Sequence, residues 1–462
     1  MSHLRLNLPK TVCIPLWEAP LAIASGMLMT VCPAWSGVEI SRHGKYLGFF
    51  IGPDKGERSW HAAGEKMRLR ARAWPWNAMG FYYATVGYNT YIASLPGYIA
   101  QLERYPEEFS AVEAAALRRA AAGPGSWVMP DDLFRLHEHY GQVASFRNLR
   151  AASLAAKVRV ATYENEQHGG LDVTRRARRL RALLRSTHHL YRKAIWRTWI
   201  EANPLLVLDE AVSKCRDLGI TAHVVQGELA GPSNPRPWTP AVARRVRSKF
   251  QATLTASIQR RELYCPKERI RHKLARWKFQ GMPRKLADAA LRHLAQLATM
   301  APPRVCAAVL STMWNRWITA RRFQREGSCV LGCSTSAQDS IEHYACCPIV
   351  RGCAATMLRI ELRPPPHAIA DFMLVSTPPA AVEPKSAMLR MALLVYAVYT
   401  STNDARRDRP RDATVSASML EQAVLNAVQS HSGAENELNS VWGAQPARRR
   451  RTALAAGGGA GR

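Results

Sequence analysis

Acidic residues are scarce in this sequence. The 462 residues include 35 Asp and Glu against 64 Lys and Arg, which gives a formal net charge of +29 at pH 7. Hydrophobic residues make up 47% of the chain and charged residues 21%, a balance that excludes a wholly disordered protein or a coiled coil. The positive excess predicts a polyanionic partner, most simply RNA or DNA, with an anionic membrane surface as the alternative.

Long uncharged apolar runs are also absent. A membrane-spanning helix needs about 18 to 20 consecutive apolar residues. The strongest runs, Ala19–Val31 and Met391–Thr400, are shorter, and the first is interrupted upstream by Glu18 and by prolines, unlike a signal peptide. We therefore expect no membrane anchor and an intracellular location, in the nucleus or the cytoplasm.

Motifs of the common catalytic sites are missing as well. A polymerase holds two divalent metal ions with carboxylates, and the one Asp-Asp pair is Asp131–Asp132. Pro130 and the apolar spacing that follows predict that this pair begins a helix, where acids suit the helix dipole. There is no Walker-type phosphate loop and no Gly-x-Ser-x-Gly motif. The sequence therefore gives no catalytic residue and no magnesium site.

The pattern along the chain predicts a mainly α protein with a small N-terminal β portion. Residues 4–51 alternate in polarity or are rich in β-forming residues, and Gly52-Pro53 closes this part. After Gly56 the periodicity becomes helical. Helices are predicted over Trp60–Trp74, Tyr82–Glu103, Pro106–Ala122, Pro130–His139, Ser145–Tyr163, Val173–Glu201, Pro240–Arg261, Leu286–Met300, Ala387–Thr400 and Thr414–Ser430.

Breaks in composition divide the chain into six predicted parts. Gly- and Pro-rich stretches mark the joints, and the Arg- and Gly-rich tail has no apolar periodicity. The parts are a β-rich portion (1–55), a helical domain (56–165), a basic helical nucleic-acid-binding region (166–310), a zinc-binding module (311–360), C-terminal helices with a Pro-rich joint (361–435) and a disordered basic tail (436–462).

Half of the ten cysteines lie within a short stretch that begins at Cys329 and ends at Cys353. One local cluster in an intracellular chain is more often a metal site than a set of disulfides. The pattern Cys329-x3-Cys333-x9-His343-x3-Cys347 supplies three thiolates and one imidazole, which suit a structural, four-coordinate zinc ion. His343 and Cys347 are four residues apart and would share one face of a helix.

Some details of this metal site stay open in the sequence. Cys346 or Cys353 could replace Cys347 as a ligand, and buried free thiols are the alternative to a metal site. Asp339 and Glu342 precede the histidine and could orient its ring as hydrogen-bond acceptors.

Two long runs of basic residues stand out. Val173–Lys193 contains no acid, and Arg244–Lys278 contains twelve cations against two acids, with aromatic residues interleaved in both runs. Arginines at phosphates together with aromatics that stack on bases are typical of a nucleic-acid-binding track, and a solvated basic face is the alternative. The predicted contacts are Arg175, Arg176, Arg178, Arg179, Arg244, Arg245, Arg247, Lys273, Arg276, Trp277 and Lys278.

Several stretches, in this order, resemble the reverse transcriptases of non-LTR (LINE-like) retrotransposons, and especially the elements of dinoflagellate genomes. "LRLNLPKTVCIPLW" resembles the segment after the catalytic Asp-Asp hairpin, where Lys10 matches a lysine beside the incoming nucleotide. "KYLGFFIGPDKGERSWHAAGEKMRLRARAW" resembles the following hairpin, with the signature Tyr46-Leu47-Gly48, and the first thumb helix.

The later stretches continue the resemblance. "GYNTYIASLPGYIAQL" resembles the thumb, and "MWNRWITARRFQ" followed by "CVLGCSTSAQDSIEHYACCP" resembles the zinc-binding segment, with Cys329, Cys333, His343 and Cys347 at its ligand positions. The resemblance implies that residues 1–55 are a remnant of the polymerase palm and that 56–165 are thumb-like. The fingers and the catalytic aspartates would then precede Met1.

The sequence and the resemblance together predict a noncatalytic fragment of an RNA-directed DNA polymerase, with a structural zinc ion, that binds RNA or DNA mainly through phosphate contacts. One alternative is a domesticated zinc-containing ribonucleoprotein or regulatory nucleic-acid-binding protein. Another is an active reverse transcriptase whose N-terminal catalytic half is missing from this chain.

Overall fold

The computed structural model describes residues 7–17, 20–156, 223–225, 228–230, 248, 251–256, 258–259, 264–279, 283–365, 367–376, 384–408 and 414–430. The chain divides into two compact units that alternate along the sequence. Unit 1 comprises Met1–Trp74, Tyr88–Arg119 and Arg147–Leu263, and unit 2 comprises Pro75–Gly87, Ala120–Phe146 and Tyr264–Arg462. Among the described residues, no helix has the length and apolar character needed to cross a membrane.

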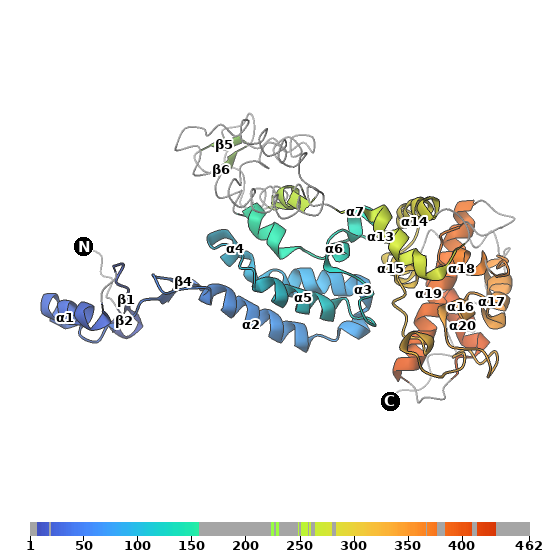
Figure 1. The fold of residues 1–462 in the computed structure, drawn as a ribbon, viewed down its shortest axis with the longest axis horizontal. Helices are drawn as coiled ribbons and strands as arrows, with labels where there is room; N and C mark the ends of the chain where they lie inside the picture. Colours follow the sequence, from blue (N-terminus) through green and yellow to red (C-terminus); the bar gives the residue numbers. More distant parts are fainter. Residues whose placement is uncertain are drawn as a thin grey trace. The chain divides into compact units, whose positions relative to one another are not determined.

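The N-terminal β portion of unit 1 consists of two small sheets (Figure 1). β1 (Val12–Cys13) pairs in parallel with β2 (Glu39–Ile40), and α1 (Leu21–Val31) lies between them in the sequence. β3 (Gly44–Tyr46) and β4 (Phe49–Ile51) form an antiparallel hairpin. Two single 3₁₀ turns, η1 (Leu8–Lys10) and η2 (Pro33–Trp35), complete this part.

The hairpin lies where the Tyr46-Leu47-Gly48 signature implies one. Its two turn residues both have positive φ, 46° at Leu47 and 93° at Gly48, as a tight two-residue hairpin turn requires. The expected strand pattern over residues 4–51 is wrong between 21 and 31, where α1 lies. That segment is rich in Ala, Leu and Met, which favour a helix, whereas the alternating pattern belongs to the residues around it.

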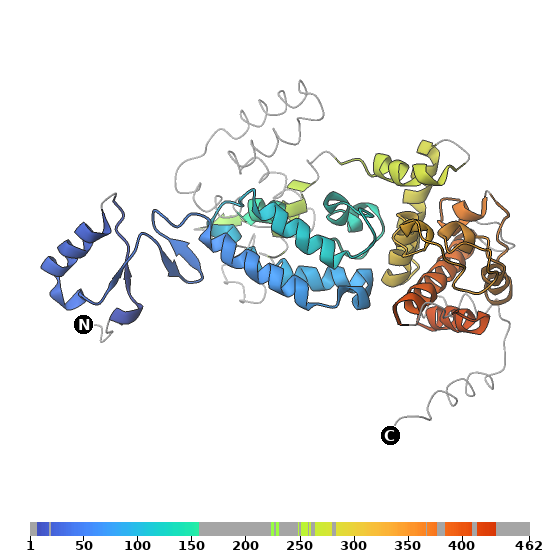
Figure 2. The same cartoon turned by 60° about the horizontal axis from the view of Figure 1, so that its bottom comes forward.

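Helix α2 (Arg58–Ala73) is the long amphipathic helix of unit 1 (Figure 2). It buries Trp60, Ala63, Met67 and Ala71 on one face, at helical spacing, and exposes basic residues on the other. The Trp60 ring packs edge-on against Phe109, with centroids 4.8 Å apart. The remaining elements of this part are the π-helix η3 (Tyr88–Ile92), η4 (Leu95–Gly97), α4 (Ile99–Leu102) and α5 (Phe109–Ala120).

A buried carboxylate joins α5 to the chain that follows Arg147 in unit 1. Glu113 accepts hydrogen bonds from the Tyr105 hydroxyl at 2.9 Å and from the Leu149 N–H at 2.8 Å. Residues 149–156 are helical, and strands β5 (His223–Val225) and β6 (Glu228–Ala230) form a further antiparallel pair.

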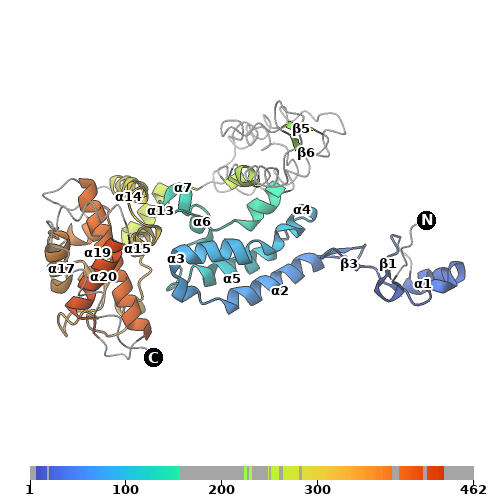
Figure 3. The same cartoon turned by 180° about the vertical axis from the view of Figure 1, so that it is seen from behind.

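Unit 2 is built around α19 (Pro384–Asp408). Residues 386–395 of this helix are all buried, as expected for a helix that is covered on every side. The helices α14 (Pro283–Ala298), α15 (Pro303–Met313), α17 (Pro348–Leu358) and α20 (Ala417–Gln429) pack against it (Figure 3). The other helices of the unit are α3 (Trp76–Gly87), α6 (Pro130–Leu133), α7 (Leu136–His139), α13 (Pro266–Leu274), η6 (Ala275–Trp277), η7 (Arg321–Phe323), α16 (Ile341–Tyr344) and α18 (His367–Phe372).

The predicted class, mainly α with a small N-terminal β portion, is confirmed for the described residues. The long helices expected near α2, α5, α14 and α20 are present within a few residues of their predicted ends, and α19 is present but continues eight residues beyond its predicted end at Thr400. The single helix expected over Tyr82–Glu103 is instead a series of short segments, and Pro130–His139 forms two separate turns. The helix predicted over Val173–Glu201 and the tail 436–462 lie outside the described residues, and the six-part division stays a prediction.

Candidate metal centre

The four side chains of the Cys/His pattern converge in unit 2. One ligand atom from each of Cys329, Cys333, His343 and Cys347 lies within 4.8 Å of the other three. The Cys333 sulfur and the His343 Nε2 are 3.1 Å apart. Ligands of a tetrahedral zinc ion lie roughly 3.3–3.8 Å from one another, given Zn–S and Zn–N bonds of about 2.3 and 2.0 Å. The cluster therefore has the size and the donor set of a four-coordinate metal site.

The first two cysteines are presented by a tight turn. The Gly332 N–H donates to the Cys329 carbonyl at 2.9 Å, and Gly332 adopts a positive φ of 70° that favours glycine. The Leu331 N–H donates to the Cys329 sulfur. The Cys329 N–H in turn donates to the Ala337 carbonyl at 2.8 Å, which fixes the base of the loop.

His343 is presented by the single turn of α16. The Ser340 hydroxyl caps this turn by accepting the His343 N–H at 3.1 Å. The expectation that Asp339 and Glu342 orient the imidazole is wrong. Asp339 accepts from the Ala320 N–H and the Tyr344 hydroxyl and pairs with Arg406, and Glu342 pairs with Arg321 at 2.8 Å.

Of the three candidates for the last ligand position, Cys347 belongs to the group of side chains that could hold a metal ion, and Cys346 and Cys353 do not. Cys347 is the residue before Pro348 at the start of α17, and its φ and ψ of −56° and 129° are those that a following proline favours. The predicted shared helix face of His343 and Cys347 is therefore wrong, because α16 ends first. Cys353 lies inside α17, where burial raises the pKa of its thiol to about 12.

The environment of Cys347 favours a thiolate. A hydrogen bond from the Cys329 thiol lowers the pKa of Cys347, and the N–H groups of Ile349 and Val350 at the start of α17 act in the same direction. The same thiol–thiol hydrogen bond raises the pKa of Cys329. Burial lowers the pKa of His343, which keeps the imidazole neutral and able to bind a metal. These residues could hold a metal ion, and their chemistry is compatible with zinc.

Comparison of the chain with family models, curated proteins and solved structures finds no match. Arguments about function therefore start from the residues and their geometry.

The predicted nucleic-acid contacts are only partly within the described residues. Lys10, Arg276 and Lys278 are exposed, and Trp277 is half-buried with its Nε1 buried and unpartnered. Lys273 is buried, 6% exposed, and its ammonium donates to the Trp127 carbonyl at 2.6 Å. The residues that lie outside the described part are Arg175, Arg176, Arg178, Arg179, Arg244, Arg245 and Arg247.

Asp131–Asp132 occupies the first turn of α6, as predicted. Asp132 is fully buried and accepts a bidentate pair of hydrogen bonds from Arg269, with N···O distances of 2.8–2.9 Å. It also accepts from the Tyr264 hydroxyl at 2.7 Å and from the Met129 N–H at 2.9 Å. Its oxygens are therefore already occupied by protein donors. A partner more than a hundred residues away in the chain leaves no signal in the local sequence pattern.

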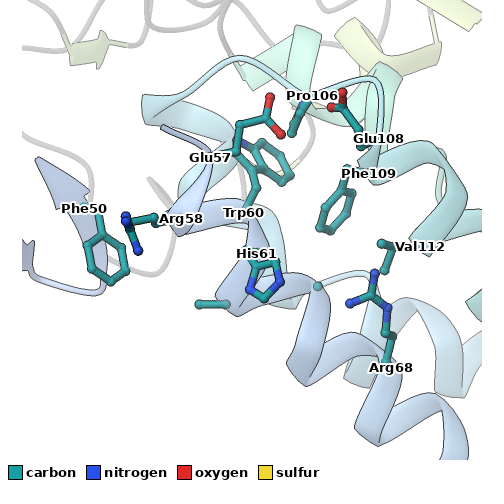
Figure 4. Close-up of a pocket in the computed structure, with 12 residues that line it drawn as sticks. Phe50, Glu57, Arg58, Trp60, His61, Arg68, Pro106, Glu108, Phe109 and Val112 are labelled. Atoms are coloured by element: carbon teal, nitrogen blue, oxygen red, sulfur yellow. The ribbon is translucent and has the colours of Figure 1, made fainter. Parts of the chain in front are cut away.

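Unit 1 contains a pocket of about 560 Å³ between the start of α2 and the start of α5 (Figure 4). The rings of Trp60 and Phe109 form its apolar part. Glu57 and Glu108 lie at one edge, and burial together with the Glu108 charge raises the pKa of Glu57. Aromatic, acidic and basic groups therefore occur together in this pocket.

Proposed function

We propose that this chain is a noncatalytic, zinc-containing nucleic-acid-binding segment of the non-LTR reverse-transcriptase kind, and that it holds RNA or DNA mainly through phosphate contacts. The observation that carries the proposal is the convergence of Cys329, Cys333, His343 and Cys347, because these are the ligand positions that the resemblance implies. The net charge of +29 supports a polyanionic partner.

The proposed role of zinc is structural. Three thiolates and one imidazole fill a tetrahedron and leave no open position for a substrate. The zinc segment is also tied to the core of unit 2, because Tyr344 packs against Trp317 and Asp339 pairs with Arg406 of α19. A metal ion at this place would fix a loop that has little regular structure of its own.

The test is the salt dependence of binding by the purified, zinc-loaded chain. If six to ten phosphates are contacted, counterion release should lower the affinity roughly 10³–10⁵-fold between 50 and 200 mM salt. Fluorescence anisotropy with single-stranded and duplex RNA and DNA measures this slope. Little sequence preference is expected, because phosphate contacts position a ligand without reading its bases.

Two outcomes would contradict the proposal. Absent or salt-independent binding by folded, zinc-loaded protein would remove the nucleic-acid role. Template-dependent primer extension that is lost in Asp132→Asn would show that the carboxylate bound by Arg269 serves catalysis. We expect no product above the blank in that assay.

A further inference from the structure

Four cations from two distant segments of unit 2 form one cluster, and three of them donate to the loop of residues 122–127. Lys273 donates to the Trp127 carbonyl at 2.6 Å, Arg316 Nε to the Ala122 carbonyl at 2.8 Å and Arg322 Nη2 to the Pro124 carbonyl at 2.8 Å. The fourth cation is Arg276 in η6. The partners in these contacts are neutral carbonyl oxygens, so the contacts orient the cations without cancelling their charge.

Arg276 and Arg322 are held on a single oxygen. With the Asn315 amide oriented so that its oxygen faces the donors, Arg322 Nη1 lies at 2.5 Å and Arg276 Nη1 at 2.6 Å from that oxygen. Two guanidinium groups that share one neutral acceptor are close enough to repel each other. Asn315 adopts a positive φ of 55°, a backbone conformation in which asparagine is enriched.

No carboxylate forms an ion pair with these four cations within the part of the chain that the structure describes. Asp132 acts electrostatically on Lys273, but it is already bound by Arg269. Burial, and after it the charge of Arg276, lowers the pKa of Arg322. Burial, and after it the charge of Arg269, lowers the pKa of Lys273 to about 8. Asp132 acts in the opposite direction, and Arg276 and Arg322 add smaller lowering effects. The electrostatics agree with the geometry in showing an excess of positive charge.

The pair is accessible to a ligand. Arg276 is exposed and Arg322 is half-buried. Gly125 lies beside Arg322 and has no side chain to cover it; an added Cβ there would be in van der Waals contact with Nη2, at 3.7 Å. Arginine forks match the oxygens of a phosphate in a planar, bidentate geometry, and two forks side by side suit one tetrahedral anion.

We propose that Arg276 and Arg322, held by Asn315 and flanked by Arg316 and Lys273, form a phosphate-binding site. The anion supplies the negative charge that the protein does not. The inference rests on the proposed function only in taking a nucleic-acid phosphodiester as the source of that phosphate. Free inorganic phosphate has the same chemistry, and the experiment below distinguishes the two.

The test compares Arg276→Gln/Arg322→Gln with Arg284→Gln, which removes an exposed charge at the start of α14 outside the cluster. In the double variant, the salt slope for single strands and duplexes should fall by about two contacts, with about 10–100-fold weaker binding near 100 mM salt. Arg284→Gln should change the affinity less than about 3-fold. Its salt slope should differ from that of the wild type by less than the equivalent of one phosphate contact. Zinc content and circular dichroism confirm folding, and the exposed Arg276→Gln alone serves if the double variant does not fold.

Inorganic phosphate provides the second arm. Phosphate should raise the melting temperature of the wild type, relative to chloride at equal ionic strength, and should raise that of the double variant less. A phosphate response confined to the wild type with unchanged nucleic-acid binding means that the site takes free phosphate, which overturns the phosphodiester assignment but keeps the anion site.

The failure of each proposal can be recognised separately. If the slope and the phosphate response of the double variant equal those of the wild type, the anion site is overturned while nucleic-acid binding stands. If the wild type binds no nucleic acid, the proposed function fails, and the phosphate response alone decides the anion site.

Discussion

The sulfur of Cys347 shows how local backbone structure selects a metal ligand. Cys346 and Cys347 are neighbours, yet only Cys347 lies at the start of α17, where two N–H groups point at its sulfur. Such donors stabilise a thiolate, and a thiolate is the form that binds zinc. Cys346 is not one of the four residues of the Cys/His cluster, and burial raises the pKa of its thiol.

This difference predicts the effect of serine substitutions. The wild type and Cys346→Ser should each carry about one zinc per chain, whereas Cys333→Ser should lose most of it, because a hydroxyl is a poor zinc ligand at neutral pH. Zinc bound by thiolates contributes on the order of 10 kcal/mol to the folding of a small unit. Hydrogen exchange across 329–347 should therefore become much faster in Cys333→Ser only.

Metal analysis of the two purified variants shows whether Cys333 and Cys346 are zinc ligands. Stoichiometric zinc in Cys333→Ser would remove that residue from the ligand set. A metal-free wild type with full protection of the same segment would show that the thiols are only buried side chains.

At the scale of helices, the prolines of unit 2 more often lie at the first residue of a helix than at a break within one. Its missing N–H is harmless in the first turn, and its fixed φ suits a helix start. No separate helix was predicted at the positions of α13, α15 and α17, each of which begins with a proline. The helices of unit 2 whose first residue is proline are α6, α13, α14, α15, α17 and α19.

Long amphipathic elements were predictable for a simple reason. The apolar spacing of α2 and α14 repeats over several turns, so the pattern is stronger than any local exception. Residues 82–103 carry a similar apolar content, but the backbone leaves the α-helix at the π-helix Tyr88–Ile92 and again at the 3₁₀ turn Leu95–Gly97. These departures depend on packing around the segment, which one sequence does not reveal.

The close approach of Gly141, which follows α7, to the backbone of α14 predicts that one added methyl group lowers the stability of the protein. Gly141 has a φ of 64°, and a Cβ at this position would lie 2.3 Å from the Leu294 carbonyl oxygen. Gly141→Ala should lower the free energy of unfolding by about 2–5 kcal/mol, from left-handed strain of about 1–2 kcal/mol and overpacking of about 1–3 kcal/mol. Urea unfolding of the zinc-loaded protein measures this loss.

Gly125→Ala is the matched control. Its φ of 57° imposes a similar strain, but the closest atom to an added Cβ is Arg322 Nη2 at an ordinary 3.7 Å. Its loss should therefore stay near 1–2 kcal/mol. Equal losses in the two variants would mean that the approach of Gly141 to α14 is relaxed in solution.

At the scale of the whole molecule, contacts between residues close in the sequence could be predicted, and contacts between distant segments could not. The Cys/His cluster lies within a short stretch, so spacing alone pointed to all four residues, although it left Cys346 and Cys353 as alternatives to Cys347. The pairs Asp132–Arg269 and Arg276–Asn315–Arg322 join segments that only the fold brings together. Of the basic residues singled out from composition, Lys273 is bound to a carbonyl inside the protein and Arg276 is exposed, a distinction that charge counting cannot make.

The two units alternate along the chain, but each has its own core. The whole Cys/His cluster and its contacts, Trp317–Tyr344 and Asp339–Arg406, belong to unit 2. Unit 1 has its own buried core around Trp60, Phe109 and Glu113. Because each unit has separate internal contacts, the loss of zinc should act first on unit 2.

Chelation followed by hydrogen exchange tests this prediction. Treatment with a zinc chelator should remove protection from α16 and the loop that carries Cys329 and Cys333, and weaken it in the parts of α18 and α19 that contact Trp317. Protection of α2 and α5 should change little. Added zinc should restore the lost protection and magnesium should not, because magnesium prefers oxygen ligands to thiolates. Simultaneous loss in α2, α5 and α16 would show instead that the chain unfolds as one cooperative body, in which the zinc cluster stabilises both units.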